Sequence, residues 1–280
     1  MRFAQILLLT CAIGSASTLT NSSFGPSDPN VIGQAAYFDT QSISVSFNSA
    51  TDQVTAVIDL DFDNGNAAIN TAPGGNQNLE PFTYAGLTLS TGDLFFYDPS
   101  APLTSQSCNN ATPPSQCVSI PANSSLAYAV VLDGGNGLAT GDLYSIGNSP
   151  TQVTLQNAYA ALSPTSDIYR PGQEVGVTAN SGSTSGTGGT EKVCQINAPG
   201  CGTGSAQYQV TLSFIAPSGS QILSLLMNGQ IGVELAAADC GNAVLAGTVG
   251  VTTPEPGTLG MIAAGIGMLG LGLVRRRRKS

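Results

Sequence analysis

The chain has 280 residues and is acidic, with 17 Asp and Glu residues against eight Lys and Arg and a formal net charge of −9. It contains no His and no Trp, which excludes Ser-His-Asp and Cys-His catalysis and removes the commonest zinc ligand. Between the two ends of the chain, only Arg170 and Lys192 are cationic, against 16 acids. This body, with a net charge of −14, repels nucleic acid, which excludes a nucleic-acid function.

The first 17 residues have the pattern of a secretory signal peptide. Arg2 supplies a positive start, residues 6–13 form an apolar stretch, and residues 14–17 are small. We expect signal peptidase to cleave after Ala16 or Ser17. A lipoprotein site at Cys11 is the less favoured alternative, because the apolar stretch continues past this cysteine.

Residues 18–251 are expected to form a single extracellular domain. With 41% hydrophobic and only 9% charged residues, the chain can build a core and has the composition of an exported β protein. Short apolar runs separated by Gly, Pro, Asn and Asp clusters predict an all-β fold, an antiparallel and jelly-roll-like β-sandwich. The predicted strands are residues 41–47, 54–63, 86–89, 94–97, 126–132, 153–155, 207–215 and 231–235.

Two early strands show strict alternation. Residues 41–47 place Ile43, Val45 and Phe47 on one side and serines on the other, and in residues 54–62 every second side chain is apolar. This period of two indicates strands with one buried face.

Three carboxylates follow the second alternating segment. Asp59, Asp61 and Asp63 would share one face of a strand, about 6.5–7 Å apart, where a hard cation such as Ca²⁺ would relieve their repulsion. The predicted ligands are Asp61, Asp63, Asn64 and Asn66. The spacing resembles the start of an EF-hand loop, but Asn64 stands where that loop needs Gly. The favoured alternative is a solvated outer face whose charges deter edge aggregation.

Residues 91–95 (TGDLF) and 140–144 (TGDLY) are near copies. The favoured interpretation is a pair of similar turns, in which Gly supplies an unusual φ and Asp a side chain-to-backbone hydrogen bond. A shared binding site is the alternative.

Two cysteine pairs bracket short loops. Export to an oxidising space predicts local disulfides between Cys108 and Cys117 and between Cys194 and Cys201. Cys240 is left over and is expected to be a buried thiol.

The second half of the body contains a flexible loop and a short helix. Residues near 180–205 begin with a Gly-, Ser- and Thr-rich run, which predicts a flexible loop within the domain and, less favoured, a linker between two domains. Residues 219–227 carry Ile222, Leu225 and Leu226 at helical spacing and predict a brief helix.

Residues 252–280 combine three features in order. Pro254, Glu255 and Pro256 come first, an apolar Gly-rich run covers residues 259–274, and a basic cluster follows. The run is about 24 Å long as a helix, which makes it a marginal transmembrane segment whose basic end stays in the cytoplasm. An ordinary membrane anchor is the alternative interpretation. The basic cluster contains Arg275, Arg276, Arg277 and Arg278.

This order of features resembles the bacterial PEP-CTERM sorting signal. The resemblance implies recognition by an exosortase, removal of the tail, and delivery to the cell surface or extracellular matrix, with membrane contact only through the tail. The same tail type also carries an "ice-binding protein C-terminal domain" label. Ice binding is not favoured, because the Thr residues follow no sustained repeat.

Together these features predict a non-enzymatic structural or adhesive protein of the surface or matrix, with no cofactor other than the possible Ca²⁺. Its expected partners are signal peptidase and exosortase during export, and extracellular polysaccharide afterwards. The alternative is a carbohydrate-binding or glycan-hydrolysing module, since the acids of the body could supply a catalytic carboxylate pair.

Overall fold

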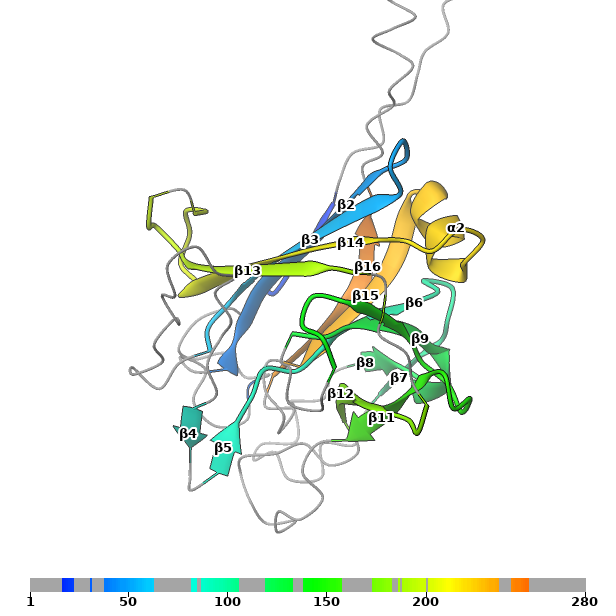
Figure 1. Cartoon of the computed structure of the whole chain (residues 1–280). Helices are drawn as coiled ribbons and strands as arrows, with labels where there is room; N and C mark the ends of the chain where they lie inside the picture. Colours follow the sequence, from blue (N-terminus) through cyan, green and yellow to red (C-terminus); the bar gives the residue numbers. More distant parts are fainter. Residues whose placement is uncertain are drawn as a thin grey trace, which may run out of the picture.

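The structure is a computed structural model. It describes residues 17–22, 31, 38–62, 82–84, 87–105, 119–132, 138–157, 173–182, 186, 188–199, 201–236 and 243–251. Two five-stranded sheets lie face to face, and all their paired strands are antiparallel (Figure 1). The predicted all-β antiparallel sandwich is therefore confirmed. Residues 1–16 of the predicted signal peptide and residues 252–280 of the tail lie outside the described residues.

The first sheet has the strand order β1-β2-β3-β14-β13, and the second has the order β10-β9-β6-β15-β16. Each sheet joins three antiparallel strands from earlier in the chain to a hairpin from later in the chain. The strands of the first sheet are β1 (Thr18–Thr20), β2 (Thr40–Asn48), β3 (Gln53–Leu60), β13 (Thr190–Gln195) and β14 (Tyr208–Ile215). The strands of the second sheet are β6 (Leu94–Tyr97), β9 (Leu126–Val130), β10 (Leu143–Ser145), β15 (Gln230–Ala236) and β16 (Val244–Gly250).

The main core lies between the two sheets. As predicted, the alternating apolar side chains of β2 and β3 are buried there, and Phe62 continues the pattern beyond β3. The second sheet contributes the inward side chains of β6 and β15, such as Phe96 and Val233. The rings of Phe96 and Phe214, one from each sheet, have centroids 5.7 Å apart. Burial of these side chains is the main source of stability.

A second core covers the other face of the second sheet. Phe95, Tyr97 and Leu126 pack there with residues of the antiparallel pair β11 (Val153–Asn157) and β12 (Glu174–Ala179). Figure 1 shows β11 and β12 beside one another. All four residues of β6 are therefore buried, with Leu94 and Phe96 facing the main core and Phe95 and Tyr97 facing the second.

The remaining elements are short. They are β4 (Phe82–Tyr84), β5 (Leu87–Leu89), β7 (Leu103–Ser105), β8 (Ser119–Pro121), the 3-10 turn η1 (Asn123–Ser125) and α2 (Gln221–Met227). The helix confirms the prediction for residues 219–227 and joins β14 of the first sheet to β15 of the second. In the described ranges, no helix has the length and apolar character needed to cross a membrane.

One expectation needs correction. The flexible loop predicted near residues 180–205 contains β13, which pairs along its whole length with β14. Val193 is its one large aliphatic side chain and is fully buried, whereas Lys192 is exposed. A strand with so few apolar residues gains its stability from pairing with β14, and its own sequence pattern is too weak to predict it.

Candidate functional site

The two Gly-Asp-Leu copies flank the same strand at the same level. Leu94 and Leu143 both pair with Val130, so β6 and β10 run alongside β9 from either side. Asp93 and Asp142 immediately precede these leucines and are 5% and 7% exposed. The sequence repeat is therefore also a spatial repeat around the end of β9.

Asp93 ties together three segments that are distant in sequence. One carboxylate oxygen accepts a hydrogen bond from the Leu132 amide at 3.0 Å, and the other accepts from the Val177 amide of β12 at 2.9 Å. The backbone amide of Asp93 donates to the Val175 carbonyl at 2.8 Å. The residue fastens the hairpin that covers the second core to the second sheet.

Asp142 makes the equivalent bond to another segment, because its carboxylate accepts a hydrogen bond from the Gly189 amide just before β13. Gly141 has a φ of +84°, which is the unusual conformation expected of the turn. Gly92 is needed for a different reason. A Cβ there would lie 2.3 Å from the carbonyl oxygen of Ala236. These contacts give both copies a structural role.

A polar group is buried in the second core, which sequence reasoning did not find. The side-chain amide of Gln173 donates to Glu234 Oε1 at 2.6 Å, and Gln173, Glu174 and Glu234 are at most 1% exposed. Burial raises the pKa of Glu234 to about 8, the Gln173 hydrogen bond opposes the rise, and the charge of Glu174 adds to it. Glu234 is therefore largely protonated at neutral pH. The only signal in the sequence is one acid inside the apolar run of β15.

Tyr97 lies over the same face of β15. A Cβ placed on its partner Gly232 would lie 2.4 Å from the Tyr97 ring, so the ring rests directly on the glycine. Burial, and secondarily the charge of Glu234, raises the pKa of Tyr97 to about 12. The tyrosine stays neutral and acts as a packing residue.

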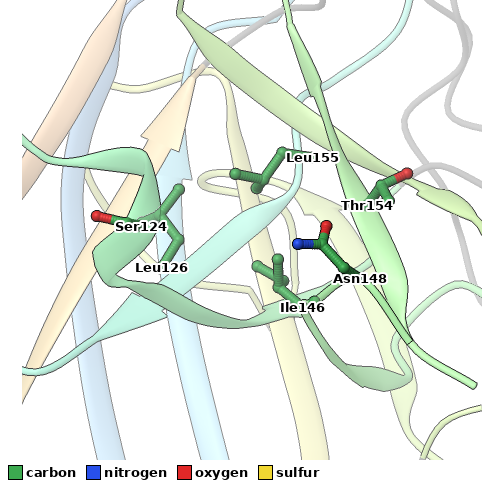
Figure 2. A pocket seen from close by; sticks show the side chains of 7 residues that line it. Ser124, Leu126, Ile146, Asn148, Thr154 and Leu155 are labelled. Atoms are coloured by element: carbon green, nitrogen blue, oxygen red, sulfur yellow. The ribbon is translucent and has the colours of Figure 1, made fainter.

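One surface pocket opens beside the second core, with a volume of about 530 Å³. Figure 2 shows the side chains of Leu126, Ile146 and Leu155 around it, with Asn148 and Thr154 nearby. Its lining residues include no acid and no cation. The pocket can accept an apolar group but offers no acid–base chemistry.

The predicted calcium ligands are only partly within the described residues. Asp61 is 8% exposed and accepts a hydrogen bond from the Gln207 amide at 2.8 Å. Burial raises its pKa to about 6, against the lowering effect of that bond. The other three predicted ligands, Asp63, Asn64 and Asn66, lie outside the described residues. Among the described residues, no cluster of three or more His, Cys, Asp or Glu side chains could hold a metal ion. Calcium binding stays a prediction.

The edge-protection interpretation of these carboxylates is wrong for Asp59 and Asp61. The edges of the first sheet are β1 and β13, whereas β3 lies at its centre. Asp59 instead accepts hydrogen bonds from Ser42 and Gln209 on the neighbouring strands. Asp61 is buried beyond the end of β3.

Cys194 and Cys201 are paired at disulfide distance, with their Cα atoms 6.0 Å apart, and they close the turn after β13. Cys108, Cys117 and Cys240 lie outside the described residues, so the first predicted disulfide and the state of Cys240 stay predictions.

Comparison with known proteins identifies the tail. The family model of the PEP-CTERM protein-sorting motif matches residues 252–279. This range contains the Pro-Glu-Pro segment and the four arginines, and the match concerns sorting and lends no support to an ice-binding label. No curated protein matches the chain, and no solved structure matches it. The chain therefore carries a PEP-CTERM sorting signal and is an exosortase-sorted protein.

Proposed function

We propose that this protein is a non-enzymatic structural or adhesive component of the cell surface or extracellular matrix. The sorting motif at residues 252–279 carries the proposal, because it directs the chain through an exosortase to the cell surface or extracellular space. The signal peptide expected at residues 1–17 would start the same route. The domain would then act outside the cell through its surface.

The environments of three described acids, Asp93, Asp142 and Glu234, support a non-enzymatic role. General acid–base catalysis requires a carboxyl group within reach of a bound substrate. Asp93 and Asp142 instead hold backbone amides, and Glu234 holds the amide of Gln173 inside the second core. A raised pKa at a buried position also arises in purely structural groups.

The alternative is a carbohydrate-binding or glycan-hydrolysing module. Hydrolysis would need two carboxyl groups facing one cleft, and the pocket beside Leu126, Ile146 and Leu155 has no acid in its lining. Binding without hydrolysis remains compatible with the proposed role, since an adhesive matrix protein needs a polymer to hold.

Fractionation of the native host tests the proposal. We expect the wild-type protein at the surface or in the medium, and we expect Pro254→Ala combined with Pro256→Ala to hold it in the membrane fraction with its tail attached. Pro150→Ala, at an exposed turn position, is the matched control and should be sorted normally. Equal export of the double variant, or turnover of matrix polysaccharide by the purified protein, would contradict the proposal.

A further inference from the structure

The outward face of the first sheet carries many hydroxyl groups. Because the strands alternate, the side chains that point away from the main core come from every second position of β2, β3 and β14. Several are short hydroxyl residues, namely Ser42, Ser44, Ser46, Thr55, Thr211 and Ser213. We call the outward side chains of β1, β2, β3, β14 and β13 the hydroxyl face.

The register aligns these hydroxyls into rows across the strands. Ser46, Thr55 and Ser213 stand opposite one another on three adjacent strands. Neighbouring strands are about 4.8 Å apart, and successive outward residues are about 6.5–7 Å apart. Ser42 is buried, and the other five hydroxyl residues are half-buried or exposed. The result is a grid of donors and acceptors on one face of the sheet.

Cross-strand hydrogen bonds hold this grid in place. Asp59 accepts from Ser42 Oγ at 3.0 Å and from Gln209 Nε2 at 2.9 Å, which forms a continuous polar row across three strands. Gln53 Nε2 donates diagonally to Ser213 Oγ at 2.9 Å, which joins two neighbouring rows. Side chains that are already ordered lose little entropy when they bind a ligand.

The charge of the face differs from that of the body. On β1, β2, β3 and β14, the only charged outward side chain is Asp59, and Lys192 on neighbouring β13 balances it. The body as a whole carries a net charge of −14. The hydroxyl face is therefore a neutral area on an anionic protein, which suits an uncharged ligand and disfavours an anionic one.

We propose that the hydroxyl face binds a neutral, hydroxyl-rich polysaccharide. The inference rests on the proposed function, which places the domain outside the cell. Sugar hydroxyls both donate and accept, as do the serine and threonine hydroxyls and the glutamine amides of the grid. A second copy of this chain is a poorer occupant, because Val57 and Ile215 are the only aliphatic outward side chains on β2, β3 and β14 and the core of an interface between copies is more apolar than this.

Affinity electrophoresis of the protein recovered from the exterior of the native host provides the test. The gels would contain hydroxyethyl cellulose, dextran, or the anionic analogue carboxymethyl cellulose. We expect at least one neutral polymer to retard the protein more than the anionic one does. Thr55→Glu combined with Thr211→Glu should weaken this retention about tenfold or more, by adding negative charge and removing two hydroxyls.

Two further variants keep the result interpretable. Thr55→Val combined with Thr211→Val keeps the shape and the strand propensity, so it should stay folded and still bind several-fold more weakly. Thr154→Val combined with Thr178→Val removes a hydrogen-bonded hydroxyl pair from the β11–β12 hairpin, beside the pocket. This control should bind like the wild type.

Four results would overturn the inference: no retardation by either neutral polymer, stronger retardation by carboxymethyl cellulose, unchanged retention of both face variants, or loss of retention only in the hairpin control. A dimer that sediments in the wild type and is lost in the face variants would assign the face to a second copy. In all of these cases, normal export would leave the proposed function intact. Failure of export would contradict the proposed function independently.

Discussion

The two sheets of the sandwich are buried in different ways. The first sheet has one buried and one outward face, so β3 alternates between buried apolar residues and partly exposed ones such as Thr55. The second sheet lies between two cores, so β6 is buried at all four positions. The comparison shows how one chain can contain both alternating and continuously apolar strands: the sequence pattern reports how many faces are covered.

The difference in burial between the two sheets also determines how much the hydrogen bonds of polar side chains contribute to stability. On the first sheet, Asp59 bonds to neighbouring strands at a partly exposed surface. On the second sheet, Asp93 and Glu234 are 5% and 1% exposed and lie beside the covering hairpin. Substitutions beside the second core should therefore lower the free energy of unfolding more than equivalent substitutions on the hydroxyl face.

The largest effect is expected for Asp93→Ala. It would leave the amides of Leu132 and Val177 buried without their acceptor, and each such loss costs about 1–3 kcal/mol. We expect the free energy of unfolding to fall by about 3–5 kcal/mol in urea titrations.

Asp142→Ala is the matched comparison, because the Asp142 side chain accepts a hydrogen bond from the Gly189 amide. This variant should lower the free energy of unfolding by about 1–3 kcal/mol. Equal losses in the two variants would contradict the view that Asp93 joins the hairpin to the second sheet.

Glu234→Gln should stabilise the protein at alkaline pH. The folded-state pKa of about 8 lies above the ordinary glutamate value of 4.5, so the wild type loses stability as pH rises between these values. Glutamine stays neutral and can still accept the Gln173 hydrogen bond. We expect a gain on the order of 2 kcal/mol at pH 8, and a smaller gain at pH 5, in urea melts.

Asp98→Asn provides the control for this pH dependence. Hydrogen bonds from the hydroxyl and amide of Ser100 lower the pKa of this exposed carboxyl group, so it stays ionised from pH 5 to 8. Its variant should show no change between those two pH values. A pH-independent effect of Glu234→Gln would show that Glu234 is not protonated in the native state.

Gly232→Ala tests the packing of Tyr97 on the second sheet. The added Cβ would lie 2.4 Å from the ring, and such overpacking costs about 1–3 kcal/mol. Gly204→Ala is the control, because the nearest atom to its Cβ is a side-chain oxygen at 3.6 Å. A thermal melt of Gly232→Ala in a Tyr97→Leu background should show partial relief of the cost. Full additivity would argue against a direct clash.

The smallest effect is expected where the chain passes from the first sheet to the second. Ser220 caps α2, and its hydroxyl accepts a hydrogen bond from the Leu223 amide at 3.3 Å. Ser220→Ala should lower the free energy of unfolding, measured in urea melts, by about 0.5–1 kcal/mol. Ser224→Ala, on an exposed position of the same helix, should cost less. A larger loss for Ser224→Ala would contradict the capping role.

Sequence patterns predicted the parts of this fold whose signals are local. The alternation in β2 and β3, the apolar runs of β6 and β15, and the spacing of α2 all depend on neighbouring residues. β13 and β16 were not predicted, because Lys192 and Gly247 interrupt their apolar patterns and their partners hold them in place.

The candidate site was predictable to a similar degree. The Gly-Asp-Leu repeat predicted a pair of similar turns in which each Asp makes a side chain-to-backbone hydrogen bond. It could not predict that the amides bound by Asp93 lie 39 and 84 residues away, since only the folded sheets bring them together. The burial of Glu234 likewise depends on the hairpin that covers the second sheet.

The intact mass of the protein recovered from the exterior of the native host is the most direct test of exosortase processing. We expect a chain that starts near Ser17 or Thr18 and lacks the apolar run and the arginines Arg275, Arg276, Arg277 and Arg278. The same measurement on a host without its exosortase should show the tail retained. An exported wild-type protein that still carries Arg275 and the residues after it would contradict exosortase processing and leave the tail as an ordinary anchor.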